Sequence, residues 1–179
     1  MNDRTGRETP RQDIDARLFR RVMGSFATGV TVITARDGEG MRGMTANAFM
    51  SGSLEPPLCV ISVARRAHLH ALLMDATHFG VSILAEHQED VSDHFSGRPD
   101  SGLELKLVSA GPVPLLAESC GRIAAEIAAR HDCGDHTIFI GHILHMEAED
   151  RRPLVYHAGR YAALDRRKVE HELAVPEFW

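Results

Sequence analysis

Residues 133–136, with the sequence Cys-Gly-Asp-His, combine a tight turn with titratable side chains. The β-prone run 137–143 follows at once, so His136 stands at the entrance of a predicted strand. A Gly-Asp pair favours a tight turn, and a histidine titrates in the physiological pH range. This pattern predicts a fixed polar group that contacts a ligand, with a purely structural turn as the alternative.

A metal site is a second interpretation of the same segment, because six possible ligands crowd along it. Cys-x-x-His can bind zinc, but a structural zinc site needs four convergent ligands that usually come from two separated pairs. Strict alternation along a strand would also direct the last two histidines to opposite faces. The sequence therefore favours no metal; the six residues are His131, Cys133, Asp135, His136, His142 and His145.

Three further segments, taken together with the Gly-Asp-His turn, resemble the flavin reductase-like family. They are 29–34 (Gly-Val-Thr-Val-Ile-Thr), 43–51 (Gly-Met-Thr-Ala-Asn-Ala-Phe-Met-Ser) and 55–58 (Glu-Pro-Pro-Leu). The resemblance extends from about Phe19 to about Leu164, and the order and spacing of the segments are its specific part.

The resemblance implies a mainly β fold, a split β-barrel of the Greek-key, FMN-binding kind with a few short helices. It also implies NAD(P)H-dependent reduction of FMN or FAD by a homodimer that supplies reduced flavin to a separate flavin-dependent monooxygenase. Two alternatives share this barrel: a flavin-binding protein without catalysis and a relative of the pyridoxamine phosphate oxidases. Fold alone does not separate them.

The resemblance also implies the cofactor-binding residues. Small residues at 45–47 let the backbone approach the flavin ring, hydroxyls at 45 and 51 donate to flavin oxygens, and arginines at 65 or 66 and at 98 neutralise phosphate. The Gly-Asp-His turn binds the nicotinamide dinucleotide, and an aromatic residue lies beside the flavin. No side chain is expected to act as a catalytic base, and the implied set is Thr31, Met44, Thr45, Ala46, Asn47, Ser51, Ser62, Val63, Arg65, Arg98, Gly134, Asp135, His136 and Tyr161.

Composition limits the class of protein. A chain of 179 residues is long enough for one stable domain. Its 20 basic and 25 acidic residues give a net charge of -5, which argues against a nucleic-acid partner. No apolar run is long enough to cross a membrane, and three cysteines suggest no disulfide framework, so we expect a cytoplasmic protein. We expect disorder over 1–12, the split-barrel domain over 13–165 and a tail over 166–179.

Hydrophobic periodicity predicts the elements that hold these residues. Asp13 is a candidate cap for a helix that covers one end of the barrel, with apolar residues at 14, 18, 22 and 26. Residues 123–130 are ambiguous, since alanine favours helix while alternation favours strand, and the family resemblance decides for strand. The other predicted elements are strands at 29–35, 41–46, 58–63, 79–84, 137–143 and 154–164, the last interrupted at Gly159, helices at 67–76 and 88–95, and a hairpin turn at 37–40.

Overall fold

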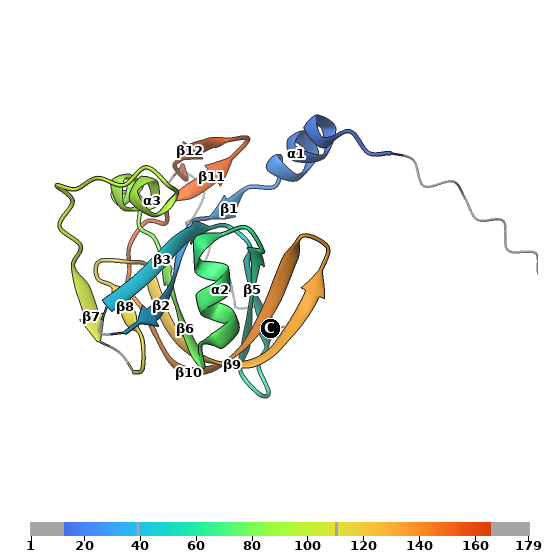
Figure 1. Cartoon of the computed structure of the whole chain (residues 1–179). Coiled ribbons are helices and arrows are strands. Elements are labelled where there is room, and N and C mark those ends of the chain that lie inside the picture. The colour runs from blue at the N-terminus through green and yellow to red at the C-terminus, as the bar shows by residue number, and fades with distance from the viewer. Residues whose placement is uncertain (1–12, 39, 110, 166–179) are drawn as a thin grey trace, which may run out of the picture.

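A computed structural model describes residues 13–38, 40–109 and 111–165. Its main element is a seven-stranded antiparallel sheet in the order β3-β2-β6-β9-β10-β5-β4 (Figure 1). The predicted disordered segment 1–12 and tail 166–179 lie outside the described residues. The strands of this sheet are β2 (Thr31–Asp37), β3 (Gly40–Ala46), β4 (Phe49–Ser53), β5 (Leu58–Ala64), β6 (His78–Ile83), β9 (Gly121–Cys133) and β10 (His136–Ala148).

The two outermost strands of the sheet, β3 and β4, are consecutive in the chain. Only Asn47 and Ala48 connect them, yet they form no ladder with each other. The sheet must therefore curl until its two edges approach, and the chain crosses the remaining gap at these two residues. This arrangement is a split barrel, and it confirms the predicted mainly β fold.

Smaller elements surround the barrel. Strand β1 (Thr28–Gly29) pairs with β11 (Val155–His157), which pairs with β12 (Arg160–Ala162). Strands β7 (Leu107–Ser109) and β8 (Pro114–Leu116) form a separate pair. The three helices are α1 (Ala16–Gly24), α2 (His68–Asp75) and α3 (Glu89–Phe95).

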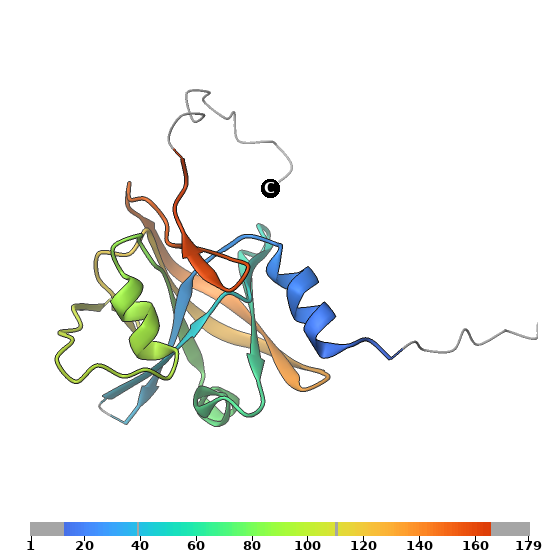
Figure 2. The ribbon, with the colours of Figure 1, turned by 90° about the horizontal axis from the view of Figure 1, so that it is seen from above.

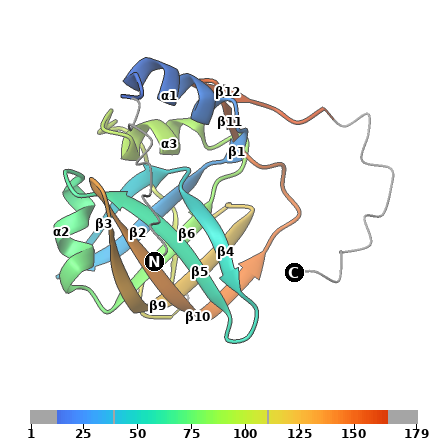
Figure 3. The ribbon, with the colours of Figure 1, turned by 90° about the vertical axis from the view of Figure 1, so that its right-hand side faces the viewer.

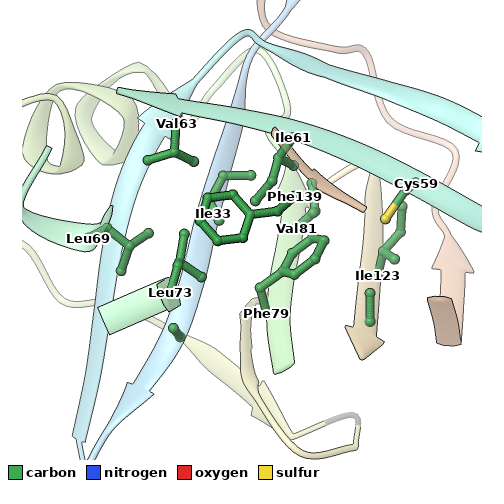
Figure 4. Close-up of a cluster of buried hydrophobic side chains, with 12 residues drawn as sticks. Ile33, Cys59, Ile61, Val63, Leu69, Leu73, Phe79, Val81, Ile123 and Phe139 are labelled. Carbon is green, nitrogen blue, oxygen red and sulfur yellow. The ribbon is translucent and has the colours of Figure 1, made fainter. Parts of the chain in front are cut away.

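The core lies inside the barrel (Figure 4). Side chains alternate between the two faces of a strand, so each strand directs every second side chain into this core. On β5 the inward residues are Cys59, Ile61 and Val63. Phe79 is fully buried, and it needs Gly141 opposite: a Cβ there would meet the Phe79 ring and come within 2.8 Å of the Ala125 Cβ. A close approach of this kind requires glycine.

The ambiguous alanine-rich segment is a strand, as predicted. Strand β9 is central, paired with β6 on one side and β10 on the other. Tertiary pairing therefore outweighs the helix propensity of alanine.

Three expectations on local structure were wrong. The helix is capped by Asp15 rather than Asp13, with the Asp15 carboxylate accepting from the Leu18 N–H at 3.0 Å. This helix covers no part of the barrel, because none of its residues is buried. A bulge between Ile143 and His145 resets the alternation of β10, so that His142 and His145 face the same side.

Candidate functional site

A cavity of about 560 Å³ lies where the β3–β4 crossing meets α3 and the β11–β12 hairpin. Its walls come from sequence segments far apart in the chain. Five predicted residues are among those that line it, and they are Thr45, Ala46, Asn47, Arg98 and Tyr161. The structure thus brings together five of the residues that were assigned to the flavin, whereas Ser51 and Arg65, which were also assigned to it, are not among those that line this cavity.

Helix α3 is tied to both other walls of the cavity by hydrogen bonds. The Thr45 hydroxyl donates to the Ser92 carbonyl at 2.6 Å. The Tyr161 hydroxyl lies 2.8 Å from Ser92 Oγ and 2.9 Å from Asp93 Oδ1, so its one hydrogen is shared between these two acceptors. Because Thr45 uses its only hydrogen inside the protein, it cannot at the same time donate to a flavin oxygen, as the sequence had suggested.

Asp93 also positions the cationic group of the cavity. The Arg98 guanidinium lies 2.9 Å from Asp93 Oδ1, the same oxygen that Tyr161 reaches. Arg98 remains largely exposed, so its other N–H groups are available to a ligand. Burial, the largest cause, raises the pKa of Tyr161 above its ordinary value, so the hydroxyl keeps its proton to a higher pH than that of an exposed tyrosine.

Strand β12 holds Tyr161 against a second aromatic residue. The rings of Tyr156 and Tyr161 meet edge to face, with centroids 5.7 Å apart. The two tyrosines also pack on a small cluster of buried residues that includes Val30 and Leu154. The aromatic wall is therefore packed against buried residues on its far side.

The second predicted feature, the Gly-Asp-His turn, joins β9 to β10. Gly134 has φ +59°, as the first central residue of a type II′ hairpin turn requires. His136 Nδ1 lies 2.7 Å from Asp135 Oδ1, and this hydrogen bond is the largest cause that lowers the pKa of Asp135. The Arg65 N–H donates to the Asp135 carbonyl at 2.9 Å, while the Arg65 side chain pairs with Asp132 at 2.8 Å.

The turn does not line the cavity, but it lies near it. Ala64 on β5 pairs with His136, and two residues earlier the Ser62 N–H donates to the Ala48 carbonyl at 3.1 Å. Two residues of strand span about 7 Å. The turn and the β3–β4 crossing are therefore neighbours along β5.

The remaining predicted residues lie elsewhere. Val63 is fully buried and Met44 packs against the same core cluster, so the Val63 side chain cannot touch a cofactor in this structure. Thr31 is also buried, and its hydroxyl donates to the Ala46 carbonyl at 2.7 Å. This hydrogen bond holds the last residue of β3 in place, directly before the β3–β4 crossing. Ser51 lines a different, apolar groove.

Several cavity residues were not predicted from the sequence. Ser92 and Asp93 lie on α3, which was predicted only as a short helix, and Tyr156 and Arg160 lie on the β11–β12 hairpin. Arg160 directly precedes Tyr161 in the chain, so its position next to a predicted residue was a signal for it. Nothing in the sequence marked Asp93 or Tyr156.

Within the described ranges, no three residues among His, Cys, Asp and Glu come close enough together to hold a metal ion. Within those ranges, too, no helix is long and apolar enough to cross a membrane.

The cavity fits a flavin by its size and its donors. Sites for small ligands have volumes of about 300–1,000 Å³ and combine apolar walls with a few polar groups. Here the aromatic pair and Ala46 supply apolar surface, while Asn47 and Arg98 supply polar groups. A split barrel with such a cavity defines a class of proteins that bind a planar aromatic cofactor between strand ends.

Comparison with known proteins gives the family. The flavin reductase like domain model matches residues 23–165. An NADH-dependent flavin reductase of a Rhodococcus species is 38% identical over 150 residues, covering 82% of this chain and 85% of the relative. The reductase component of 4-hydroxyphenylacetate 3-monooxygenase from Thermus thermophilus is 44% identical over 147 residues, covering 82% and 95%.

Solved structures agree with these sequence matches. Flavin reductase PheA2 superposes with a TM-score of 0.83 at 35% identity, covering 86% of this chain and all of that one. The NADH:FAD oxidoreductase SgcE6 of Streptomyces globisporus, in complex with NAD and FAD fragments, gives 0.78 at 34% identity, covering 86% and 95%. This chain belongs to the flavin reductase-like family, and the resemblance found in the sequence is confirmed.

Proposed function

We propose that this protein uses NADH to reduce FMN or FAD, with the flavin held in the cavity beside α3 and the nicotinamide at the Gly-Asp-His turn. The observation that carries this assignment is the cavity itself, which gathers five residues of the predicted flavin set around α3. NADH rather than NADPH is proposed because curated relatives are named as NADH-dependent.

The cavity offers each part of a flavin a suitable neighbour. Arg98, oriented by Asp93, supplies a charge-assisted donor for phosphate. The Asn47 amide and the backbone of Ala46 can reach the polar edge of the ring system, and Tyr161 forms an aromatic wall. When bound, the flavin supplies a ring that accepts hydride, and the protein supplies position and electrostatics.

The turn is suited to hold the reductant nearby. Asp135 keeps His136 in one orientation through their hydrogen bond, so the imidazole presents its Nε2 to a ligand. Because the turn lies about two residues along β5 from the β3–β4 crossing, a dinucleotide held there extends toward the cavity. Holding two reactants in the right geometry is the principal task of such a site.

The proposal extends to the partners of the protein. Relatives include reductase components of flavin-dependent monooxygenases, which supports transfer of reduced flavin to a separate oxygenase here. A homodimer is supported by the outer face of β5 and β10, where apolar residues such as Val60 and Ile138 are only partly covered. A cytoplasmic location is supported by the three free cysteines.

The test is anaerobic mixing of the purified protein with flavin and reduced nicotinamide. Catalytic loss of the visible absorbance of oxidised FMN or FAD on adding NADH is the expected result, and separate reactions with each flavin and with NADPH rank the substrates. Flavin that binds to the protein but keeps its oxidised spectrum would identify a flavin carrier instead. Arg36→Ala, outside the cavity and the turn, is a control expected to keep wild-type rates.

A further inference from the structure

Helix α3 presents two carboxylates to the cavity. Glu89 and Asp93 are four residues apart, so they lie on the same side of the helix, and both line the cavity. Figure 2 and Figure 3 show α3 and the β11–β12 hairpin together at one end of the barrel. Acidic groups on the wall of a site for a phosphorylated ligand need an explanation, because like charges repel each other.

Only one of these two carboxylates has a counter-charge. Asp93 lies 2.9 Å from the Arg98 guanidinium and accepts a hydrogen bond from the Tyr161 hydroxyl. Glu89 is exposed, and its side chain forms no ion pair or hydrogen bond within the part of the chain that the structure describes. The Glu89 carboxylate therefore adds an unbalanced negative charge to this wall of the cavity.

Arg160 is the other cationic residue among the described residues of the lining, and it does not balance Glu89. Successive side chains of a strand point to opposite faces. The contacts of the Tyr161 hydroxyl with α3 show that its ring faces the cavity. The side chain of Arg160, the preceding residue of β12, is therefore directed to the other face of the strand.

Reduction of a flavin changes the charge of its ring and not the charge of its phosphate. A hydride, which carries two electrons, leaves C4 of the nicotinamide and forms the N5–H bond of the flavin. NADH thereby becomes NAD⁺, and the ring, which is neutral when oxidised, takes up one negative charge and holds it at N1 near neutral pH. The cavity therefore holds a neutral ring before the reaction and an anionic ring after it.

The position of Glu89 on α3 lets it act on the ring rather than on the phosphate. A helix rises 1.5 Å per residue, so Glu89 lies about 6 Å along α3 from Asp93, which contacts the aromatic wall at Tyr161. This is shorter than the screening length of about 8 Å at physiological ionic strength. Glu89 also offsets the positive end of the helix dipole in the first turn, whereas Arg98, the proposed phosphate partner, follows the opposite end.

We propose that Glu89 makes the cavity bind reduced flavin more weakly than oxidised flavin and so promotes release of the product. This inference rests on the proposed function, because it concerns the flavin held in this cavity. The carboxylate repels the anionic reduced ring and has little effect on the neutral oxidised ring. An unpaired charge set against one of two ligand forms is a general source of specificity. Here it favours transfer of reduced flavin to a separate acceptor.

An anaerobic redox titration of the bound flavin with dithionite tests the proposal. The potential of bound flavin relative to free flavin gives the ratio of the affinities for the two redox forms, by thermodynamic linkage. In the wild type this potential should lie below that of free flavin. Glu89→Gln should keep the affinity for oxidised flavin and tighten binding of reduced flavin by about three- to tenfold, which raises the two-electron potential by about 15–30 mV. An unchanged potential would overturn the proposal.

Matched variants separate the effect of charge from that of structure. Glu89→Asp keeps the charge and should behave as the wild type. Asp90→Asn removes the same charge from the same helical turn but at a different pocket, so the potential should not change. A shift as large as that of Glu89→Gln would reject the assignment. Raising the salt concentration from about 0.1 to about 1 M should diminish the Glu89→Gln shift, because screening shortens; a shift indifferent to salt would indicate packing instead.

Riboflavin, which lacks the phosphate, shows which part of the flavin Glu89 acts on. The Glu89→Gln shift should be the same with riboflavin, FMN and FAD, and a shift confined to the phosphorylated flavins would contradict an effect on the ring. Because dithionite replaces NADH, the titration does not depend on NADH oxidation. NADH-dependent reduction with no effect of Glu89→Gln would reject this inference alone, whereas a potential shift without NADH-dependent reduction would support it and reject the reductase activity.

Discussion

Asp93 Oδ1 accepts a hydrogen bond from the Tyr161 hydroxyl at 2.9 Å and also lies 2.9 Å from the Arg98 guanidinium. One carboxylate oxygen therefore positions both the aromatic wall of the cavity and its cation. Arg98 follows Asp93 closely in the chain, whereas Tyr161 lies 68 positions beyond it, so α3 links the β11–β12 hairpin to the loop that carries Arg98.

Asp93→Asn should weaken flavin binding without changing the fold. The amide keeps the shape but loses the charge that orients Arg98, and because this pair is exposed the expected loss is about three- to tenfold in affinity. Fluorescence titration with FMN and FAD measures it. Asp90→Asn, on the same helix but at a different pocket, is the control expected to bind flavin normally; equal effects of the two substitutions would remove Asp93 from the site.

The raised pKa of Tyr161 predicts how the cavity responds to alkali. The folded protein holds the phenolic proton more tightly than the unfolded chain, so this contribution to stability is complete below the ordinary tyrosine pKa near 10 and is lost as pH rises through the higher folded value. Flavin affinity should fall over the same range, because a phenolate cannot donate to Asp93. Tyr161→Phe should abolish this alkaline dependence; a wild-type curve that matches the variant would contradict it.

The proposed nicotinamide site and flavin site should respond separately to substitution, one in KM for NADH and the other in flavin affinity. His136→Ala removes the imidazole at the turn, so KM for NADH should rise by about tenfold, the effect of losing about 1.4 kcal/mol of binding, while flavin affinity stays near that of the wild type. Steady-state kinetics and flavin titration on one preparation check this. His131→Ala, exposed on the neighbouring strand β9, is the control. Loss of flavin binding in His136→Ala would place that histidine in the flavin site instead.

Asn47→Leu should have the opposite effect. The residue crosses the gap between β3 and β4 and lines the cavity, so a branched apolar side chain would block access to the backbone and remove the amide. Flavin affinity should drop by about tenfold or more, with KM for NADH nearly constant at saturating flavin. Ser53→Leu, on β4 but in the other groove, is the matched substitution. Unchanged flavin binding in Asn47→Leu would exclude the crossing from the site.

Most strands were predictable because one face of each is buried. The alternation of Cys59, Ile61 and Val63 is clear in the sequence, and it also implies that Val63 points inward, away from any ligand. Strand β4 was missed as a strand because its Ser-Gly-Ser segment has weak β propensity, and it is defined by pairing with β5.

The cavity was predictable only in part. The segment 45–47 and Tyr161 lie in stretches that the family resemblance marks, whereas Asp93 acquires its role from a contact with Tyr161, 68 positions away. No local pattern encodes such a contact. The exposure of α1 could not be predicted from the sequence either. An amphipathic repeat shows that a helix has an apolar face, but it does not show whether the surface that covers this face belongs to the same chain.

A buried arginine on β9 gives a prediction about acid stability. The Arg122 side chain is almost fully buried and lies 2.7 Å from Glu147 and 2.6 Å from Glu149. The hydrogen bond from Arg122 is the largest cause that lowers the pKa of Glu147 below its ordinary value. For Glu149 the largest cause is the hydrogen bond from Arg151, followed by the one from Arg122, and its pKa is lowered as well. Their contribution to stability is therefore present above the ordinary glutamate pKa and is lost as pH falls through the lowered folded values.

Replacing both carboxylates, Glu147→Gln with Glu149→Gln, should lower the melting temperature at neutral pH more than either single change, because the buried guanidinium then lacks a counter-charge. The difference from wild type should shrink as pH falls from the ordinary glutamate pKa through the lowered folded values, where the native carboxylates also become protonated. Adding Arg122→Met should restore part of the lost stability at neutral pH, since it removes the uncompensated charge. Thermal melts of the wild type, the two single variants, the double variant and the triple variant across pH test this. A triple variant less stable than the double one would show that Arg122 stabilises the strand by packing rather than through its ion pairs.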